Sequence, residues 1–186
     1  MTFKFIKIVF IALFFLMGVN TLSAANRFYV GSGNWNTTTK WSTTSGGATG
    51  ASVPGASDIA IFDVNSGTCS IDVNVSVAGI NTTGYTSTIT QNAFTLTVGA
   101  SNLIWAGGTY TGSASAITVN GTFTLSGGTF TSTSGTFTSA GSFTLTAGTF
   151  NHNNGTVTFT VAATITSGIF YNLTFNGAGI FTITNN

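Results

Sequence analysis

Hydrophobic and polar residues alternate along most of the chain beyond residue 75, in short runs separated by glycines. The segments 122–125, 129–131 and 136–138 each place large apolar residues next to threonines. Alternation with a period of two, rich in Thr and Phe, indicates short β-strands with one buried face. The glycines between the runs supply the permissive backbone that a chain needs at corners. The pattern therefore predicts an all-β protein.

The alternating runs also repeat, with a period of about 20 residues, which is typical of solenoid proteins. The unit Gly-Thr/Ser-Phe/Val-Thr/Asn begins at six glycines between Gly121 and Gly155, and three consecutive units make one repeat. Several independent columns share the period. They are Gly108, Gly128, Gly148 and Gly168; Tyr110, Phe130, Phe150 and Phe170; Trp105, Leu125, Leu145 and Ile165; and Leu103, Phe123, Phe143 and Ala163.

Three short strands and three corners in every repeat describe one turn of a triangular parallel β-solenoid. Stacked turns lie ~4.8 Å apart, so each column becomes a ladder of touching side chains. We expect the column from Tyr110 to Phe170 to form an aromatic ladder in the core. The usual crossover preference makes the expected fold a right-handed parallel β-helix. A β-sandwich also alternates, but its antiparallel strands need not match at a fixed offset.

The first 25 residues read as a secretory signal peptide. Lys4 and Lys7 precede an apolar run at 8–19, and small residues lead to a cleavage site after Ala25. This apolar run is shorter than the ~20 residues that a membrane-spanning helix needs. We therefore expect a secreted or cell-surface protein with no membrane attachment after cleavage. The alternative is an uncleaved membrane anchor.

Three parts of the chain are expected from these patterns. They are the signal peptide at 1–25, an N-terminal cap or entry module at 26–75, and solenoid repeats at 76–186. No capping sequence follows the last alternating run, so we expect the repeats to belong to a longer solenoid. An open last rung would expose strand edges, through which the protein could associate with itself.

The composition narrows the possible functions. Only 4% of the residues are charged, against ~25% in ordinary domains. Nucleic-acid binding is disfavoured because it needs clustered Lys and Arg. The single cysteine, Cys69, shares its alternating run with Ile71 and Val73, and we expect it to be buried. An intermolecular bridge or a free thiol is the alternative for Cys69.

The entry module departs from the repeat in character. It contains Arg27-Phe-Tyr-Val-Gly-Ser-Gly-Asn-Trp35, then Lys40-Trp41-Ser, and later Asp58-Ile-Ala-Ile-Phe-Asp63. Followed by Gly-Thr-Phe-Thr repeats, this order resembles bacterial secreted surface proteins with a parallel β-helix passenger, both adhesin-like and autotransporter-like. The resemblance implies an exported repeat protein with an adhesive or structural role. It does not extend to a translocator, a sorting domain or an anchor.

Two tryptophans stand out in this module. We expect Trp35 and Trp41 to cover the open end of the first rung as a structural cap. The alternative is a sugar-stacking platform, because exposed indole faces suit carbohydrate rings.

The few ionisable side chains suggest no catalytic site. Asp58, Asp63 and Asp72 match no EF-hand or RTX-type spacing, so we expect them to be solvated or to cap turns; one structural Ca²⁺ is the alternative. His152 lies in a corner sequence, 151–154, and is expected to be a solvated loop residue. No cofactor or metal is expected.

Two functions that need no catalysis fit the sequence. The first is an adhesive or structural role at a bacterial surface, with glycans or other cell-surface chains as partners. The second is ice binding, because outward threonines would form two files with intervals of ~4.8 Å and ~6.6 Å. These files resemble the Thr-x-Thr arrays of β-solenoid antifreeze proteins. Their members are Thr109, Thr129 and Thr149 in one file and Thr111 and Thr131 in the other.

A polysaccharide lyase or hydrolase built on a β-helix is the remote alternative. Such enzymes need convergent carboxylates, Lys or Arg. From Leu103 onward the sequence contains none of these residues. We therefore expect a protein that is not an enzyme.

Overall fold

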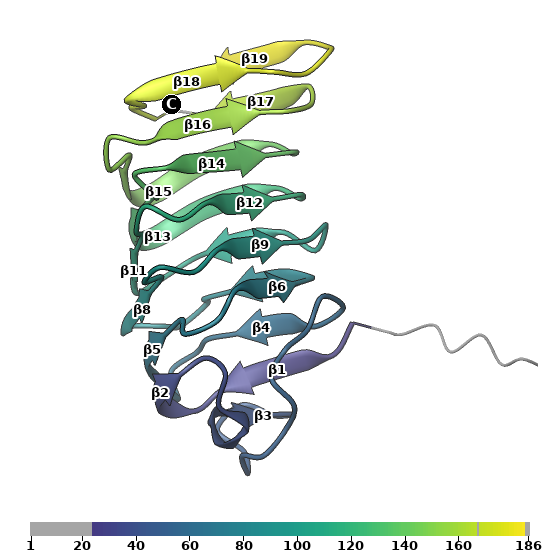
Figure 1. Cartoon of the computed structure of the whole chain (residues 1–186), viewed down its shortest axis with the longest axis vertical. Coiled ribbons are helices and arrows are strands. Elements are labelled where there is room, and N and C mark those ends of the chain that lie inside the picture. The colour runs from purple at the N-terminus through teal and green to yellow at the C-terminus, as the bar shows by residue number, and fades with distance from the viewer. Residues whose placement is uncertain (1–23, 167, 185–186) are drawn as a thin grey trace, which may run out of the picture.

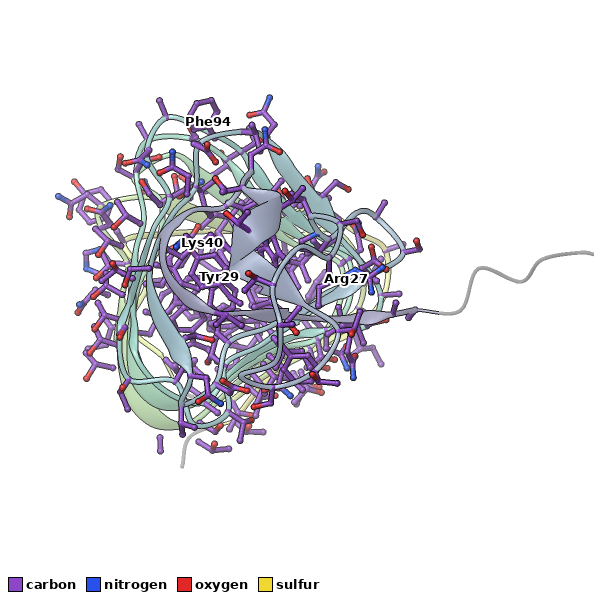
Figure 2. The ribbon with its side chains drawn as sticks, turned by 90° about the horizontal axis from the view of Figure 1, so that it is seen from below. Arg27, Tyr29, Lys40 and Phe94 are labelled. Atoms are coloured by element: carbon purple, nitrogen blue, oxygen red, sulfur yellow. The ribbon has the colours of Figure 1, made fainter. Side chains whose placement is uncertain are left out.

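The structure is a computed structural model that describes residues 24–166 and 168–184. Its strands stack in layers along one axis (Figure 1), and the view along that axis has a three-sided outline filled with side chains (Figure 2). One sheet has 13 strands, which bend round two sides of the triangle, and the other has six. The predicted all-β parallel solenoid is confirmed, and it has about six turns. Residues 1–23 of the predicted signal peptide lie outside the described residues.

Three faces make up the triangle. The first face contains β1 (Asn26–Tyr29), β4 (Ile59–Ile61), β7 (Gly79–Asn81), β10 (Leu103–Trp105), the starts of β13 (Phe123–Thr131) and β15 (Phe143–Asn151), β17 (Ala163–Thr166) and β19 (Phe181–Thr184). The second face contains β2 (Gly31–Asn34), β5 (Ser66–Ser70), β8 (Thr88–Thr90), β11 (Thr109–Thr111) and the ends of β13 and β15. The third face is the six-stranded sheet of β6 (Val75–Val77), β9 (Leu96–Val98), β12 (Ile117–Val119), β14 (Thr136–Ser139), β16 (Thr156–Phe159) and β18 (Asn172–Phe175).

The register follows the period of the sequence in the middle of the stack. Leu103 pairs with Phe123, which pairs with Phe143, and Thr109 pairs with Thr129. Each apolar column therefore points inward and buries its side chains against the rungs above and below. Burial of these columns provides the main stabilisation, because a single rung has no inner face of its own to pack against.

The predicted columns are wrong at the last repeat. Phe143 pairs with Ile165 instead of Ala163, and Ala163 pairs with Phe181. The preceding strands are in register, with Ser139 opposite Phe159. The corner that follows is therefore two residues longer in this rung than in the one before, and it places Val161 at the surface with 42% exposure. The next rung compensates for the shift, because Ile165 pairs with Ile183, which lies two full periods after Phe143.

The aromatic column forms a ladder whose geometry changes along the stack. The rings of Tyr110 and Phe130 are stacked at 4.6 Å with an interplanar angle of 6°, and Phe130 and Phe150 are parallel at 6.2 Å. Phe170 is tilted by 58° relative to Phe150. Residues 169–171 form no strand, so the sheet no longer holds the last ring in line.

The entry module is part of the same stack. Asn26 of β1 pairs in parallel with Ile59 of β4, which pairs with Gly79 of β7. The expected boundary near residue 75 is therefore no break in the sheet. Beyond the first rung, η1 (Thr38–Lys40) and β3 (Trp41–Ser42) fold back, and β3 pairs antiparallel with β1. Figure 1 shows these elements at the lower end of the column.

The opposite end of the stack carries exposed apolar side chains. Ile169, Ile180 and Ile183 are 79%, 80% and 60% exposed, and Phe175 is 43% exposed. β18 is the terminal strand of the third face, and β19 pairs with β17. Within the described residues, no helix has the length and apolar character needed to cross a bilayer.

Candidate functional site

The charged side chains of the described residues lie at one end of the column. They are Arg27, Lys40, Asp58, Asp63 and Asp72, and the sequence from residue 73 onward has no Lys, Arg, Asp or Glu. Figure 2 shows Arg27 and Lys40 near the N-terminal end of the stack, where the cap loops lie. The longer part of the solenoid thus presents surfaces without any formal charge.

The three carboxylates accept hydrogen bonds from nearby loop groups. These bonds run from Gly55 N to Asp58 Oδ2 (2.9 Å), from Asn65 N to Asp63 Oδ1 (2.8 Å), from Ser45 Oγ to Asp63 Oδ2 (2.6 Å), and from Asn36 N to Asp72 Oδ1 (2.9 Å). Such contacts stabilise turns, as expected for Asp in loops. In residues 24–166 and 168–184, no three His, Cys, Asp or Glu side chains lie close enough to share a metal ion.

Trp35 and Trp41 lie inside the cap, where they are 1% and 0% exposed. Trp41 contacts Tyr29 at a centroid distance of 5.1 Å, and Trp35 contacts Phe62 at 5.8 Å. These rings close the N-terminal end of the apolar core. Their burial leaves no indole face open to a sugar ring, so the sugar-stacking alternative is wrong.

His152 lies in the corner after β15, as the sequence indicates. Its Nδ1 accepts a hydrogen bond from the backbone N–H of Asn154 at 3.0 Å, and its ring stacks on exposed Tyr171 at 5.5 Å. The ring therefore helps to shape a corner.

Cys69 is buried, as its alternating run predicts, with 2% exposure. Burial raises the pKa of its thiol to about 12. A thiol that keeps its proton at neutral pH is a poor nucleophile and a poor metal ligand. Cys69 thus belongs to the core.

Gln91 is a buried polar residue that the sequence reasoning missed. Its Nε2 donates hydrogen bonds to the backbone oxygens of Phe94 (3.0 Å) and Ser115 (3.1 Å), and its Oε1 accepts one from Ser113 N (3.1 Å). The side chain ties together two rungs at the corner marked by Phe94 in Figure 2. In the sequence, the only sign of this role is that Gln91 lies at the corner between two alternating strands, β8 and β9.

The threonines singled out by the sequence lie on the outer surface of the second face. Thr109, Thr129 and Thr149 are in register, and Thr111 pairs with Thr131 in the neighbouring file. The second file ends with Asn151, opposite Thr131. The sequence reasoning missed Thr88 and Thr90, which pair with Thr109 and Thr111 and extend both files, because they are out of step with the strict period.

The third face carries a longer file, which the sequence reasoning also missed. We call it the central file, and it runs through one outward hydroxyl residue in each of the six strands. Its members are Ser76, Thr97, Thr118, Thr138, Thr158 and Thr174. A neighbouring file contains Thr95, Thr136 and Thr156, with Ala116 between the first two in the stack. Thr118, Thr138 and Thr158 follow the 20-residue period, but the steps toward the two ends of the file differ from it.

No protein-family model, no curated protein and no solved structure matches this chain. The geometry therefore establishes the β-solenoid fold, and the function is inferred from the surfaces described above.

Proposed function

We propose that this chain is an exported, non-enzymatic module with an adhesive or structural role at a bacterial surface. One observation carries the proposal: beyond residue 72 the solenoid has no charged residue, and the outward files of its second and third faces are mostly Thr, Ser and Asn. Such a surface can exchange hydrogen bonds with glycans or other chains, and it does not repel a neighbouring copy by charge. The likeness to β-helix passengers supports the same role.

Self-association through the last rung is part of this proposal. Phe175 and Ile183 are exposed there on the outermost strands, and unpaired strand edges are templates for pairing with another chain. At the other end, the buried indoles of Trp35 and Trp41 cover the core. Contacts between copies of residues 26–186 would therefore join their rungs at β18 and β19.

The proposal is tested with the secreted chain, residues 26–186. Binding to bacterial cells and to a panel of purified polysaccharides is measured, and self-association is followed by analytical ultracentrifugation. We expect binding to at least one of these targets. A double variant with Thr111→Glu and Thr131→Glu places charge on the second face and should weaken any contact made there. A folded chain that binds neither cells, nor polysaccharides, nor itself at high micromolar concentration would refute the adhesive role.

Ice binding is a second candidate function, and the register of the threonine files supports it. Paired threonines such as Thr109 and Thr129 repeat at the ~4.8 Å interval between rungs, on a surface with no charge. A periodic array of hydroxyl and methyl groups can order water in a lattice. Thermal hysteresis and inhibition of ice recrystallisation test this candidate, and the absence of both would end it.

A further inference from the structure

We propose that the outer surface of the third face is an ice-binding site, with the ordered water of an ice crystal face as its ligand. This inference rests on the second candidate function, ice binding. It assigns the site to a surface different from the one that the sequence suggested. Both surfaces carry threonines and no charge beyond residue 72, so the choice between them depends on the regularity and the length of each array.

The third face is the more regular of the two. Its six strands pair in parallel without a shift of register from β6 to β18. The second face has an irregular register between β2 and β5, and after β15 the chain forms no strand at 169–171. A rigid crystal lattice requires a receptor surface whose spacing stays constant over many repeats. The third face meets this requirement over its whole height.

The central file supplies one hydroxyl per rung in six consecutive rungs. Five intervals of ~4.8 Å make it ~24 Å long. In β14 and β16 a second threonine lies two residues earlier, Thr136 beside Thr138 and Thr156 beside Thr158, at ~6.6 Å. In these two rungs the array therefore has two distinct periods. Oxygen positions in crystal faces of ice repeat on a comparable scale in two directions.

The hydroxyls of the central file are available to an outside ligand. Among the hydrogen bonds of the described residues, none is made by the side chains of Thr97, Thr118, Thr138 or Thr158. On the second face, one member of the files, Thr131, already accepts a hydrogen bond at its Oγ1 from Asn151 Nδ2 at 3.3 Å. Free donors and acceptors on the third face can therefore all point to the same layer of water.

The central threonines are also held in place before any ligand arrives. Thr97, Thr118, Thr138 and Thr158 are each half-buried between the neighbouring rungs. A β-branched side chain has few χ1 rotamers, and close neighbours restrict them further. Little side-chain entropy is then lost when the surface binds, which favours a weakly interacting ligand such as ordered water.

Ice fits this surface better than a glycan does. The outward positions of β9, β12, β14 and β16 carry no charged and no aromatic side chain. Small-ligand sites are usually concave and combine apolar walls with a few convergent polar groups. A flat, neutral, repeating net lacks the means to select one sugar. It does match a neutral lattice that is itself flat and repeating.

The experiment compares three double variants that place bulky side chains on different faces. Thr118→Tyr with Thr138→Tyr disrupts the third face, and Thr109→Tyr with Thr129→Tyr disrupts the second. Thr124→Tyr with Thr144→Tyr alters outward positions of the first face and is the matched control. Thermal hysteresis and recrystallisation inhibition are measured at equal concentration, and circular dichroism melting verifies the fold. We expect loss of activity in the third-face variant alone.

A milder pair, Thr118→Ser with Thr138→Ser, keeps the hydroxyls and removes the methyl groups, so a reduced hysteresis in a fully folded protein would support the same site. If the native chain is active and the third-face variants keep that activity, the inference is wrong while ice binding stands. If the second-face variant alone loses activity, the site belongs to the second face. A native chain without hysteresis or recrystallisation inhibition overturns both the inference and the candidate function.

Discussion

Trp41 donates its indole N–H to the backbone oxygen of Trp35 across 2.7 Å, and the two rings meet edge to face with centroids 5.0 Å apart. Phe62 contacts both rings and also lies 5.4 Å from Tyr85, one rung further along. The cap is thereby joined to the hydrophobic core of the stack. We expect the entry module and the lower rungs to unfold together, because they share one continuous cluster of buried rings.

Replacing Trp41 should destabilise the whole protein. The change Trp41→Ala removes the hydrogen bond to Trp35 and opens a large cavity, so we expect a loss of about 3–5 kcal/mol. The change Trp41→Phe retains part of the ring contact and should cost less. Urea unfolding followed by circular dichroism measures both effects. Thr124→Ala, on an outer surface, is the control, and an unchanged midpoint in Trp41→Ala would contradict the structural cap.

Tyr110→Phe should make the protein more stable. The Tyr110 hydroxyl is buried, and among the described residues it has no hydrogen-bond partner. A buried unsatisfied polar group costs about 1–3 kcal/mol. The next rung carries Phe130 at the same position, stacked at 4.6 Å, so a phenyl ring fits there. An increase in the free energy of unfolding of about 1 kcal/mol is expected. A decrease would mean that the hydroxyl does find a partner.

Gly128→Ala should be strongly destabilising. Gly128 has a φ of +69°, and a Cβ at this position would overlap the backbone oxygen of Gly108. The strained backbone and the clash with a neighbouring rung should together cost more than about 1 kcal/mol. Gly55→Ala is the matched control, because Gly55 is not in the left-handed region and only Asp58 Oδ2, at 3.9 Å, is near its Cβ position. Equal melting temperatures for the two variants would contradict the close packing of the rungs.

The protein should lose stability at alkaline pH. Burial raises the pKa of the Cys69 thiol from 9.0 to about 12 and also raises the pKa of the Tyr110 phenol above its ordinary value of 10.0. Above those ordinary values the unfolded chain releases these protons while the folded chain keeps them. Their stabilising contribution is therefore complete below pH 9 and declines as the pH rises further.

Urea midpoints recorded from neutral pH to about pH 11 test this dependence. Tyr110→Phe removes one of these buried acidic groups. Above the ordinary pKa of tyrosine, the free energy of unfolding of the variant should therefore fall less steeply with pH than that of the native chain, by up to about 1.4 kcal/mol per pH unit. A flat profile across this range in the native chain would show that the groups ionise equally in both states.

The sequence predicted the fold well where the repeat is strict. Between Leu103 and Phe143 every rung has the same length, so residues one period apart pair across neighbouring strands. The prediction is wrong at Ala163 because two residues inserted in a corner shift the register without changing the local alternation. The length of a corner depends on how the chain packs at the turn. The alternation of residues within a strand therefore cannot predict it.

The surfaces were harder to predict than the core. The file of Thr109, Thr129 and Thr149 was visible because it follows the strict period. Thr88 and the ends of the central file, toward Ser76 and Thr174, depart from this period, and the file was missed. Only the three-dimensional pairing shows that Thr158 and Thr174 are neighbours.

The sequence alone thus determined the alternation of buried and exposed residues, the stacking of aromatic columns and the absence of charge beyond residue 72. These are local or strictly periodic properties, set by which side chains avoid water and by the two-residue repeat of a strand. The tertiary structure decided which face is unbroken, that Trp35 and Trp41 are buried, and which hydroxyls remain free. Those features depend on corner lengths and on contacts between segments far apart in the chain, which only the folded arrangement brings together.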